Sequence, residues 1–396
     1  MSLNDTPRAN RLHIGIFGKR NTGKSSLINA ITGHETALVS EFAGTTTDPV
    51  YKSMEIYGIG PCVLIDTAGF DDEGKIGELR VEKTRKAVEK TDVALVIFSE
   101  DTFIDSEKKW IDDLKRKNIP TIAILNKSDL ISNIEGISRY IEENTGSRPI
   151  IVSAKTKGGI EKIRTAIIRH MPEDYDAKTI TGGIVNNGDV VLLVMPQDIQ
   201  APKGRLILPQ VQTLRELLDK KCVVLSATTD KLDDALRALT KPPEVIITDS
   251  QVFKTVYEKK PKESKLTSFS VLFAGYKGDL DYYTKSVVAI DNLTENSRVL
   301  IAEACTHAPL SEDIGREKIP KLLREKIGEK LEIDLVSGTD FPDDLSEYNL
   351  IIHCGACMFN RKYVLSRIEK AHKYNIPMTN YGVVIAYLSG ILGKIV

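Results

Sequence analysis

A glycine-rich loop near the start of the chain has the residue types and spacing that bind nucleotide phosphates. Residues 18–25, GKRNTGKS, fit the pattern GxxxxGK[ST]; they follow an apolar, strand-like run at 12–17 and precede a helix-like stretch. In such a loop the glycines let successive backbone N–H groups face the phosphates at a helix N-terminus. Lys24 then reaches the β and γ phosphates, and the Ser25 hydroxyl ligates Mg²⁺. We therefore predict a nucleoside triphosphate site here.

Four further motifs follow along the chain, and one of them indicates which nucleotide base is bound. They are GTTTD at 44–48, DTAG at 66–69, NKSD at 126–129 and SAK at 153–155. Asp66 ends an apolar strand, from which it can orient Mg²⁺ through water, and the N–H of Gly69 can reach the γ phosphate. Asn126 and Asp129 indicate guanine, because a carboxylate accepts from the N1 and N2 donors that adenine lacks. The alternative reading as ordinary turns does not account for this order, so we expect GTP and GDP rather than ATP.

This segment resembles the TrmE and Era group of Ras-like GTPases, whose P-loops read like GKRNTGKSS and whose switch I contains GTT-x-D. The resemblance implies that Thr46 is the switch threonine that senses Mg²⁺. Phe70 stands where Ras-type enzymes have the glutamine that orients the attacking water, and an apolar ring cannot do this. In the similar group a K⁺ ion, held partly by an asparagine at the position of Asn21, stands in for an arginine finger. The alternative is that Asn21 only caps the loop, and Thr47 departs from the arginine usual in the group.

The motifs together predict the residues of the nucleotide site. The catalytic residues are Lys24, Thr46, Asp66 and Gly69. The residues expected to contact the nucleotide are Gly18, Asn21, Thr22, Gly23, Lys24, Ser25, Ser26, Thr46, Asn126, Lys127, Asp129, Ser153, Ala154 and Lys155. Ser25 and Thr46 are expected to contact Mg²⁺ and Asn21 to contact K⁺, and we expect slow GTP hydrolysis that K⁺ stimulates.

A second group of reactive residues lies near the end of the chain. Cys305 and His307 form C-T-H, and His353, Cys354 and Cys357 form H-C-G-A-C, each just after an apolar, strand-like run. Ligands of open parallel sheets bind beyond the carboxyl ends of the strands, so two such ends near the reversal of strand order would bring these side chains together. Three thiolates suit a zinc ion completed by histidine or a 4Fe-4S cluster with one non-cysteine ligand, and spacing does not separate these. The alternatives are a redox pair at Cys354 and Cys357 and a buried thiol at Cys305.

The order of apolar runs predicts three α/β domains. Residues 1–172 are expected to form a P-loop, Ras-like domain, because strand-like runs alternate there with helix-like stretches. A polar stretch at 171–189 is expected as a linker. Residues 185–260 are expected as a small α/β domain, and residues 266–396 as a doubly wound, Rossmann-like domain whose strands are SVLFAG, RVLIAEAC, EIDLVS and NLIIHCGAC. Each domain is expected to fold separately.

The combination of this GTPase segment, a small middle domain and a terminal CxH...HCxxC signature resembles the HydF-type GTPases of FeFe-hydrogenase maturation over all 396 residues. The resemblance implies a scaffold and carrier, or metallochaperone, that binds a 4Fe-4S cluster through Cys305, Cys354 and Cys357. It implies a two-iron precursor built with radical-SAM maturases and delivered to apo FeFe-hydrogenase, and a middle domain that makes a homodimer or higher homo-oligomer. His307 and His353 match the family's histidines. The fourth cluster ligand stays open between these histidines and a nearby carboxylate such as Glu312.

The net charge and the distribution of apolar residues limit the binding partners and the cellular compartment that we expect. The formal net charge of -1 lacks the basic excess of a nucleic-acid-binding protein, so no nucleic acid is expected. The start of the chain has no apolar signal region and no run of 18 apolar residues occurs, so we expect a cytoplasmic protein without a membrane. Cys62 and Cys222 lie in strand-like runs and are expected in the core. The rival function is a TrmE or Era-type RNA-modification or ribosome-assembly GTPase with a structural zinc site.

Overall fold

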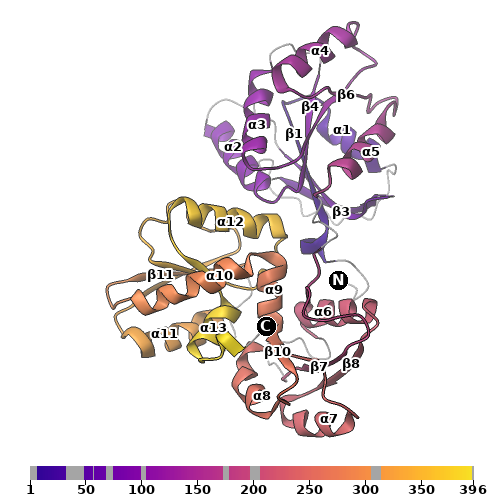
Figure 1. Ribbon diagram of the computed structural model, residues 1–396. Coiled ribbons are helices and arrows are strands. Elements are labelled where there is room, and N and C mark those ends of the chain that lie inside the picture. Colours follow the sequence, from indigo (N-terminus) through magenta and orange to yellow (C-terminus); the bar gives the residue numbers. More distant parts are fainter. Residues whose placement is uncertain are drawn as a thin grey trace. The chain divides into compact units, whose positions relative to one another are not determined.

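The computed structural model divides the chain into two compact units, residues 1–175 and 176–396. The structure describes residues 7–32, 49–56, 58–67, 75–99, 104–172, 178–196, 206–304 and 314–394. Figure 1 shows that each unit is built from sheets covered by helices. The two units are described separately below.

The described strands of the first unit form a six-stranded sheet in the order β2-β3-β1-β4-β5-β6. The strands are β1 (Leu12–Gly18), β2 (Val50–Ile56), β3 (Gly60–Asp66), β4 (Val93–Phe98), β5 (Thr121–Leu125) and β6 (Ile150–Ile151). All neighbours are parallel except β2 and β3. The edge strand β2 was not predicted, because its residues VYKSMEI are half-buried and have no continuous apolar run.

Helices cover both faces of this sheet, as the sequence predicts for a P-loop domain. They are α1 (Lys24–Thr32), α2 (Lys75–Val88), α3 (Asp105–Arg116), α4 (Ile134–Thr145) and α5 (Ile160–His170). Apolar residues of α1 and α5 pack on one face against alternate residues of β1 such as Ile14 and Ile16. Residues of α2, α3 and α4 pack on the other face, together with Phe17. Because both faces are covered, the central strands β1 and β4 are buried throughout their length and almost entirely apolar.

The second unit contains two parallel, four-stranded sheets, with orders β10-β9-β7-β8 and β12-β11-β13-β14 among the described strands. The first consists of β7 (Val190–Val194), β8 (Val223–Ala227), β9 (Val245–Thr248) and β10 (Lys265–Ser268) with helices α6 (Leu208–Asp219), α7 (Leu232–Ala238), α8 (Phe253–Lys259) and α9 (Phe269–Lys277). The second consists of β11 (Arg298–Glu303), β12 (Glu332–Ser337), β13 (Leu350–His353) and β14 (Met378–Asn380) with α10 (Leu280–Ser286), α11 (Ile319–Ile327), α12 (Arg361–Lys373) and α13 (Tyr381–Leu388). The α/β class expected for both segments is confirmed.

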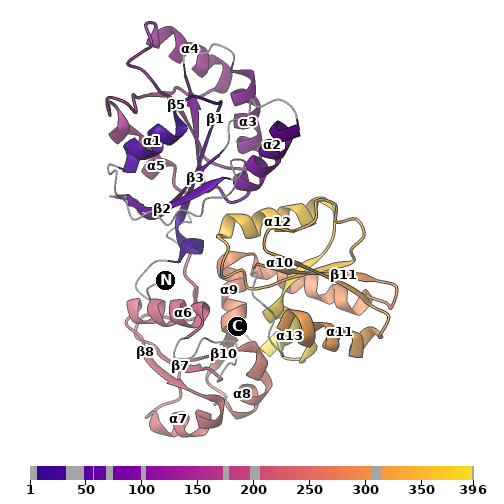
Figure 2. The ribbon, with the colours of Figure 1, turned by 180° about the vertical axis from the view of Figure 1, so that it is seen from behind.

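The expectation of a strand at SVLFAG is wrong, because these residues form helix α9. The Ser268 side chain accepts from the N–H of Val271 and caps the helix. Phe269 and Phe273 pack in the core of the β7 sheet, whereas Ala274 packs in the core of the β11 sheet. The helix is therefore apolar on most sides, and the polar face that would have distinguished it from a buried strand is missing. Figure 2 also shows α9 between the two sheets of this unit.

The two sheets of the second unit share a core, so the expectation that residues 185–260 and 266–396 fold separately does not hold. Ala386 and Ile391, at and just after α13, pack with Leu192 of β7 and Leu266 of β10. At the start of α13 a Cβ on Gly382 would lie 2.5 Å from the Ser270 Oγ of α9. Only glycine permits this close crossing, which joins the two halves of the unit.

Part of the polar stretch predicted as a linker is packed into the second unit. Ile180 and Val185 are buried in the core beside β7. Glu216 of α6 accepts from the backbone N–H of Thr181 at 2.9 Å and from its hydroxyl at 2.6 Å. One half-buried carboxylate thus satisfies hydrogen-bond donors of this segment, which forms no helix or strand. No described helix is both long and apolar enough to span a bilayer.

Candidate functional site

The P-loop leaves the sheet at the carboxyl end of β1 and enters α1, as the motif requires. Lys24 is buried, and its Nζ donates to the carbonyl oxygens of Gly18 at 2.9 Å and Lys19 at 2.7 Å. The Thr22 hydroxyl also donates to the Lys19 oxygen, at 2.9 Å. The ammonium group is therefore held against the loop where phosphates would bind.

Two of the three residues expected to serve Mg²⁺, Ser25 and Asp66, lie side by side. Parallel pairing of β1 with β3 sets Ile16 opposite Asp66, so Asp66 ends its strand beside the start of the P-loop. The Ser25 Oγ donates to Asp66 Oδ2 at 2.9 Å. Burial raises the pKa of Asp66, and the Ser25 hydrogen bond and the charges of Lys24 and Lys52 oppose that rise. A hydroxyl and a carboxylate oxygen thus converge, which is the donor chemistry that Mg²⁺ prefers.

The motif expected to read guanine is joined directly to the P-loop. Asn126 follows β5 and is 1% exposed; its Nδ2 donates to the Thr22 carbonyl at 2.9 Å, and its Oδ1 accepts from the Ala154 N–H at 3.1 Å. Asp129 is exposed, and its Oδ1 accepts from the Ser153 Oγ at 2.5 Å. This bond lowers the pKa of Asp129, so the side chain is an ionised acceptor. Three of the expected motifs are therefore joined by side-chain hydrogen bonds.

The remaining expected nucleotide residues differ in how the structure places them. Ser26 and Lys155 are exposed and Lys127 is half-buried. Asn21 is exposed and has a φ of 62°, a left-handed conformation that asparagine adopts more readily than most residues. This backbone requirement is compatible with the capping alternative for Asn21. Thr46 and Gly69 lie outside the described residues, as do Thr47 and Phe70.

Two residues of α3 that no motif indicates contact the P-loop and the strand before it. Glu107 is 3% exposed, and its carboxylate lies 3.2 Å from the Lys19 ammonium. Trp110, one turn further along, stacks on Phe17 with ring centroids 6.0 Å apart. Both residues are on the helical face that carries core residues, but nothing in the sequence shows that Glu107 meets a lysine almost ninety positions earlier.

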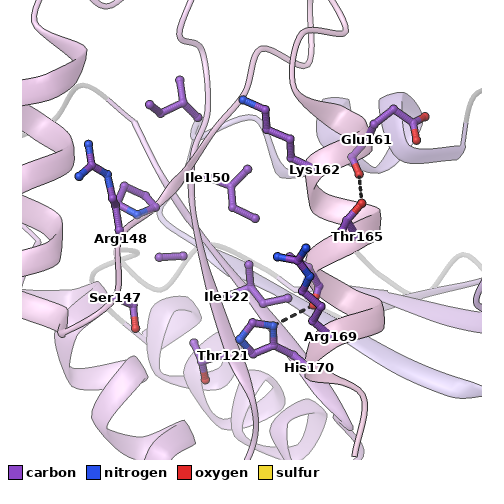
Figure 3. A pocket seen from close by; sticks show the side chains of 14 residues that line it. Thr121, Ile122, Ser147, Arg148, Ile150, Glu161, Lys162, Thr165, Arg169 and His170 are labelled. Atoms are coloured by element: carbon purple, nitrogen blue, oxygen red, sulfur yellow. Dashed lines mark hydrogen bonds between the residues drawn. The ribbon is translucent and has the colours of Figure 1, made fainter.

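A pocket of about 770 Å³ in the first unit lies away from these motifs (Figure 3). Its lining includes Thr121 and Ile150, which begin β5 and β6, and Lys162 and Arg169 of α5. These are the amino ends of the strands, opposite the carboxyl ends that carry the motifs. No residue predicted for the nucleotide site lines it, so it is separate from the chemistry described above.

The cysteine segments follow two neighbouring strands. β11 lies between β12 and β13 with Ala302 opposite His353, and the chain runs from β11 to β12 on one side before it returns to β13 on the other. The carboxyl ends of β11 and β13 therefore flank the reversal of strand order, as the sequence predicted. Cys305, His307 and Glu312 lie outside the described residues. Among the residues that are described, no three His, Cys, Asp or Glu side chains form a metal site.

Backbone donors surround the sulfur of Cys354. Its Sγ accepts from the N–H of Ala304, which directly precedes Cys305, at 2.9 Å and from the N–H of Ala356 at 3.4 Å. Burial raises the pKa of the Cys354 thiol to about 11, and these two hydrogen bonds oppose the rise. Cys357 is half-buried in the same loop. Two of the three predicted thiol ligands thus lie in one loop, beside the end of the strand that leads to the third.

His353, one of the predicted metal ligands, has a hydrogen-bond partner at each of its ring nitrogens. It is fully buried; its Nδ1 lies 2.7 Å from the Cys354 carbonyl oxygen and its Nε2 lies 2.8 Å from Arg367 Nη1. Since arginine only donates, Nε2 is the acceptor and Nδ1 carries the proton. Burial and the Arg367 charge lower the pKa of His353 to about 3. Ligation by this imidazole would therefore cost one of its hydrogen bonds.

Cys62 and Cys222 are both buried. Cys62 is in β3, and burial raises the pKa of its thiol to about 12. Cys222 directly precedes β8 and packs with Val191 and Leu217. Their placement in the core, as expected from the sequence, is confirmed.

We expect Gly23→Ala to lower guanine-nucleotide affinity about tenfold or more, because a Cβ there would lie 2.5 Å from the Asn126 Nδ2 that bridges the motifs. Gly60→Ala is the matched control: its φ of +86° nearly equals the +87° of Gly23, but a Cβ at Gly60 meets nothing within 4 Å. Titration of both variants with a fluorescent GDP analogue measures the difference. Equal affinity in the two variants would contradict the role assigned to the contact between Gly23 and Asn126 in nucleotide binding.

Three family models match the chain. Residues 13–127 match the 50S ribosome-binding GTPase model, residues 180–278 the hydrogen maturase F dimerization domain and residues 281–396 the hydrogen maturase F tetramerization domain. The model boundary at 278 to 281 falls after α9, so β10 and α9 belong with the middle segment. The matches support the homo-oligomer expected from the sequence.

Similar curated proteins match the GTPase segment. The tRNA modification GTPase MnmE of Endomicrobium trichonymphae is 39% identical over 163 residues, which are 40% of this chain and 35% of the relative. GTPase Der of Wolinella succinogenes is 36% identical over 167 residues, which are 40% of this chain and 35% of that protein. The chain therefore spans about a third of the length of these relatives.

Among solved structures, Era from Aquifex aeolicus bound to GDP and AlF4⁻ is 19% identical, with a TM-score of 0.34 over 58% of this chain and 98% of that chain. The G domain of the T. maritima FeoB iron transporter is 19% identical, with a TM-score of 0.33 over 40% of this chain and 98% of that chain. The two hydrogen maturase F models follow one another without overlap and together cover more than half of the chain, behind an N-terminal GTPase domain. The chain therefore belongs to the hydrogen maturase F family.

Proposed function

We propose that this chain hydrolyses GTP and that its last segment holds a 4Fe-4S cluster, on which a two-iron precursor is carried to apo FeFe-hydrogenase. The observation that carries the proposal is the adjacency of β11 and β13, whose carboxyl ends lead into CxH and HCxxC. The residues that would hold the cluster are Cys305, Cys354 and Cys357. Radical-SAM maturases are the proposed source of the precursor.

The cysteine sulfurs that the structure describes are chemically suited to hold an iron–sulfur cluster. Cys354 and Cys357 offer two sulfurs from one loop, and N–H bonds to the Cys354 sulfur favour its thiolate, which is the form that binds metal. Thiolate ligands suit iron–sulfur clusters. A cluster with three thiolate ligands supplies one iron whose fourth ligand can be exchanged. His307 and Glu312 remain candidates for that ligand, and His353 would have to give up a hydrogen bond first.

The proposed GTPase site uses the same residues that the motifs predicted. Asn126 and Asp129 would bind guanine, Lys24 the phosphates, and Ser25, Thr46 and Asp66 the Mg²⁺ site, with Gly69 donating to the γ phosphate. GTP binding would bias the conformation of the protein or its choice of partner. The rival RNA-modification function is drawn from relatives that match only the GTPase segment. Metal analysis distinguishes it, because a structural zinc site would replace iron.

Asp129→Asn is expected to change the preference of the site from GTP to xanthosine triphosphate. Xanthine has an acceptor where guanine has its N2 donors, and asparagine can donate to it, whereas the ionised Asp129 cannot. Competition between the two nucleotides for binding measures the change. Ser153→Ala is the control, because it removes the Asp129 hydrogen bond but leaves the carboxylate, and it should keep the preference for GTP. Retention of GTP preference in Asp129→Asn would contradict the assignment of base recognition.

Hydrolysis is expected to be slow and faster in K⁺ than in Na⁺, because Phe70 cannot orient water and a monovalent cation must offset the developing charge. Asn21→Asp and Asn21→Ala separate the two roles proposed for this residue. Aspartate adopts a left-handed φ and caps loops, and it retains an oxygen ligand, so it should keep the K⁺ response that alanine loses. Steady-state phosphate release in matched chloride salts measures these rates. Equal rates in the two salts for the unmodified chain would rule out the K⁺ role.

Replacing Cys305, Cys354 or Cys357 with alanine is expected to remove most of the iron bound after anaerobic reconstitution, because each change leaves two thiolates to hold a cubane. Cys62→Ala and Cys222→Ala are matched controls, since both thiols are buried in cores and should leave the iron content unchanged. Iron and zinc quantitation with electron paramagnetic resonance measures the result, and GTP hydrolysis should persist throughout. A chain that binds zinc and no iron would refute the carrier function.

A further inference from the structure

Arg367 is a buried cation in the second unit that lies against the proposed cluster loop. It is on α12 and is 2% exposed. Its guanidinium lies over the rings of Phe341, Phe359 and Tyr363, at 4.7, 5.1 and 4.7 Å from their centroids. Aromatic faces attract a cation but do not neutralise it.

The hydrogen-bond partners of Arg367 are all neutral in the described parts of the chain. Its Nη1 donates to His353 Nε2 at 2.8 Å, and its Nη2 donates to the Gly338 carbonyl at 2.6 Å and to the Tyr363 hydroxyl at 3.2 Å. Because arginine only donates, the His353 Nε2 that accepts from it carries no proton, so this imidazole is neutral and does not offset the Arg367 charge. Buried arginines are ordinarily paired with an acid, because removal of an uncompensated charge from water is costly. A negatively charged group close to Arg367 would therefore stabilise its buried charge.

Two hydrogen bonds, both made by His353, connect Arg367 to Cys354 at the start of the cysteine loop. His353 Nε2 accepts a hydrogen bond from the Arg367 guanidinium, and His353 Nδ1 donates to the Cys354 carbonyl oxygen. The Asn380 Nδ2 also donates to this carbonyl, at 3.2 Å. The Cys354 sulfur itself faces two N–H donors, from Ala304 and Ala356. Two N–H donors thus face the sulfur, and the Arg367 charge is connected through His353 to the carbonyl of the same residue; such surroundings favour an anionic ligand.

We propose that Arg367 is the fixed positive charge that balances the thiolate ligands and the group they hold, and that it thereby raises the reduction potential of that group. The inference rests on the proposed iron–sulfur function. Reduction adds negative charge to a site that already contains thiolates, and a nearby desolvated cation stabilises the reduced state more than the oxidised one. Among the described residues Arg367 donates to His353, Gly338 and Tyr363, so it is a positioning residue that acts through its charge and through His353.

Arg367→Gln and Arg367→Lys in the full-length chain test the proposal. Glutamine keeps hydrogen-bond donors without the charge, whereas lysine keeps the charge without the planar arrangement of guanidinium donors. After anaerobic reconstitution, a redox titration followed by electron paramagnetic resonance gives the midpoint potential. Arg367→Gln should lower the reduction equilibrium constant about tenfold or more, which is about 59 mV for a one-electron couple. Arg367→Lys should stay near the unmodified chain. Arg361→Gln is the control on the same helix, because its guanidinium donates to the carbonyls of Tyr276 and Gly278 and should leave the potential unchanged.

The outcomes separate this proposal from the function on which it rests. An unchanged potential in Arg367→Gln would overturn it, as would equal loss of iron from the glutamine and lysine variants while both keep the thermal transition of the unmodified chain. Loss of iron from the glutamine variant alone would support it, because charge would then be the property required. An unmodified chain that binds no iron would instead refute the proposed function itself.

Discussion

Parallel pairing of buried strands is the constraint on which both candidate sites depend. Strands covered on both faces exclude polar side chains along their length, so polar groups first appear where the chain leaves the sheet. Because parallel strands all leave at the same edge, β1, β3 and β5 bring the P-loop, Asp66 and Asn126 together from distant positions. β11 and β13 also end side by side, and each is followed along the sequence by one of the cysteine segments.

The two sites favour negative groups by different means. The P-loop presents backbone donors and Lys24, whose ammonium lies against carbonyl oxygens and can turn toward a phosphate. The cysteine loop has Arg367, which aromatic rings and a neutral histidine hold in place. A cation bound by carbonyl oxygens at a loop suits a ligand that binds and leaves at each turnover, whereas a cation enclosed by aromatic rings suits a group that stays bound while its ligands exchange. This contrast agrees with the distinct roles proposed for the two sites.

The motifs made much of this arrangement predictable, because residues such as Lys24, Asp66, Asn126 and Cys354 are recognisable from local spacing. The strand-like runs also predicted most of both parallel sheets. Helix α9 could not be identified, since a helix that packs in two cores lacks the polar face on which a helical period depends. Glu107 and Arg367 were missed for another reason. Their importance comes from partners brought close only by folding, and a single acid or base on a helix has no local signature of burial.

The sharing of α9 and α13 between two cores limits how this protein can be divided or recombined. A fragment cut at the 278 to 281 boundary would lack the helix that covers part of the β11 sheet, and it would expose Ala386 and Ile391, which are covered by the neighbouring β7 sheet. Such apolar surface promotes aggregation of a fragment in isolation. The two maturase segments are therefore best produced and truncated as one unit, whereas the described core clusters of the first unit contain no residue of the second.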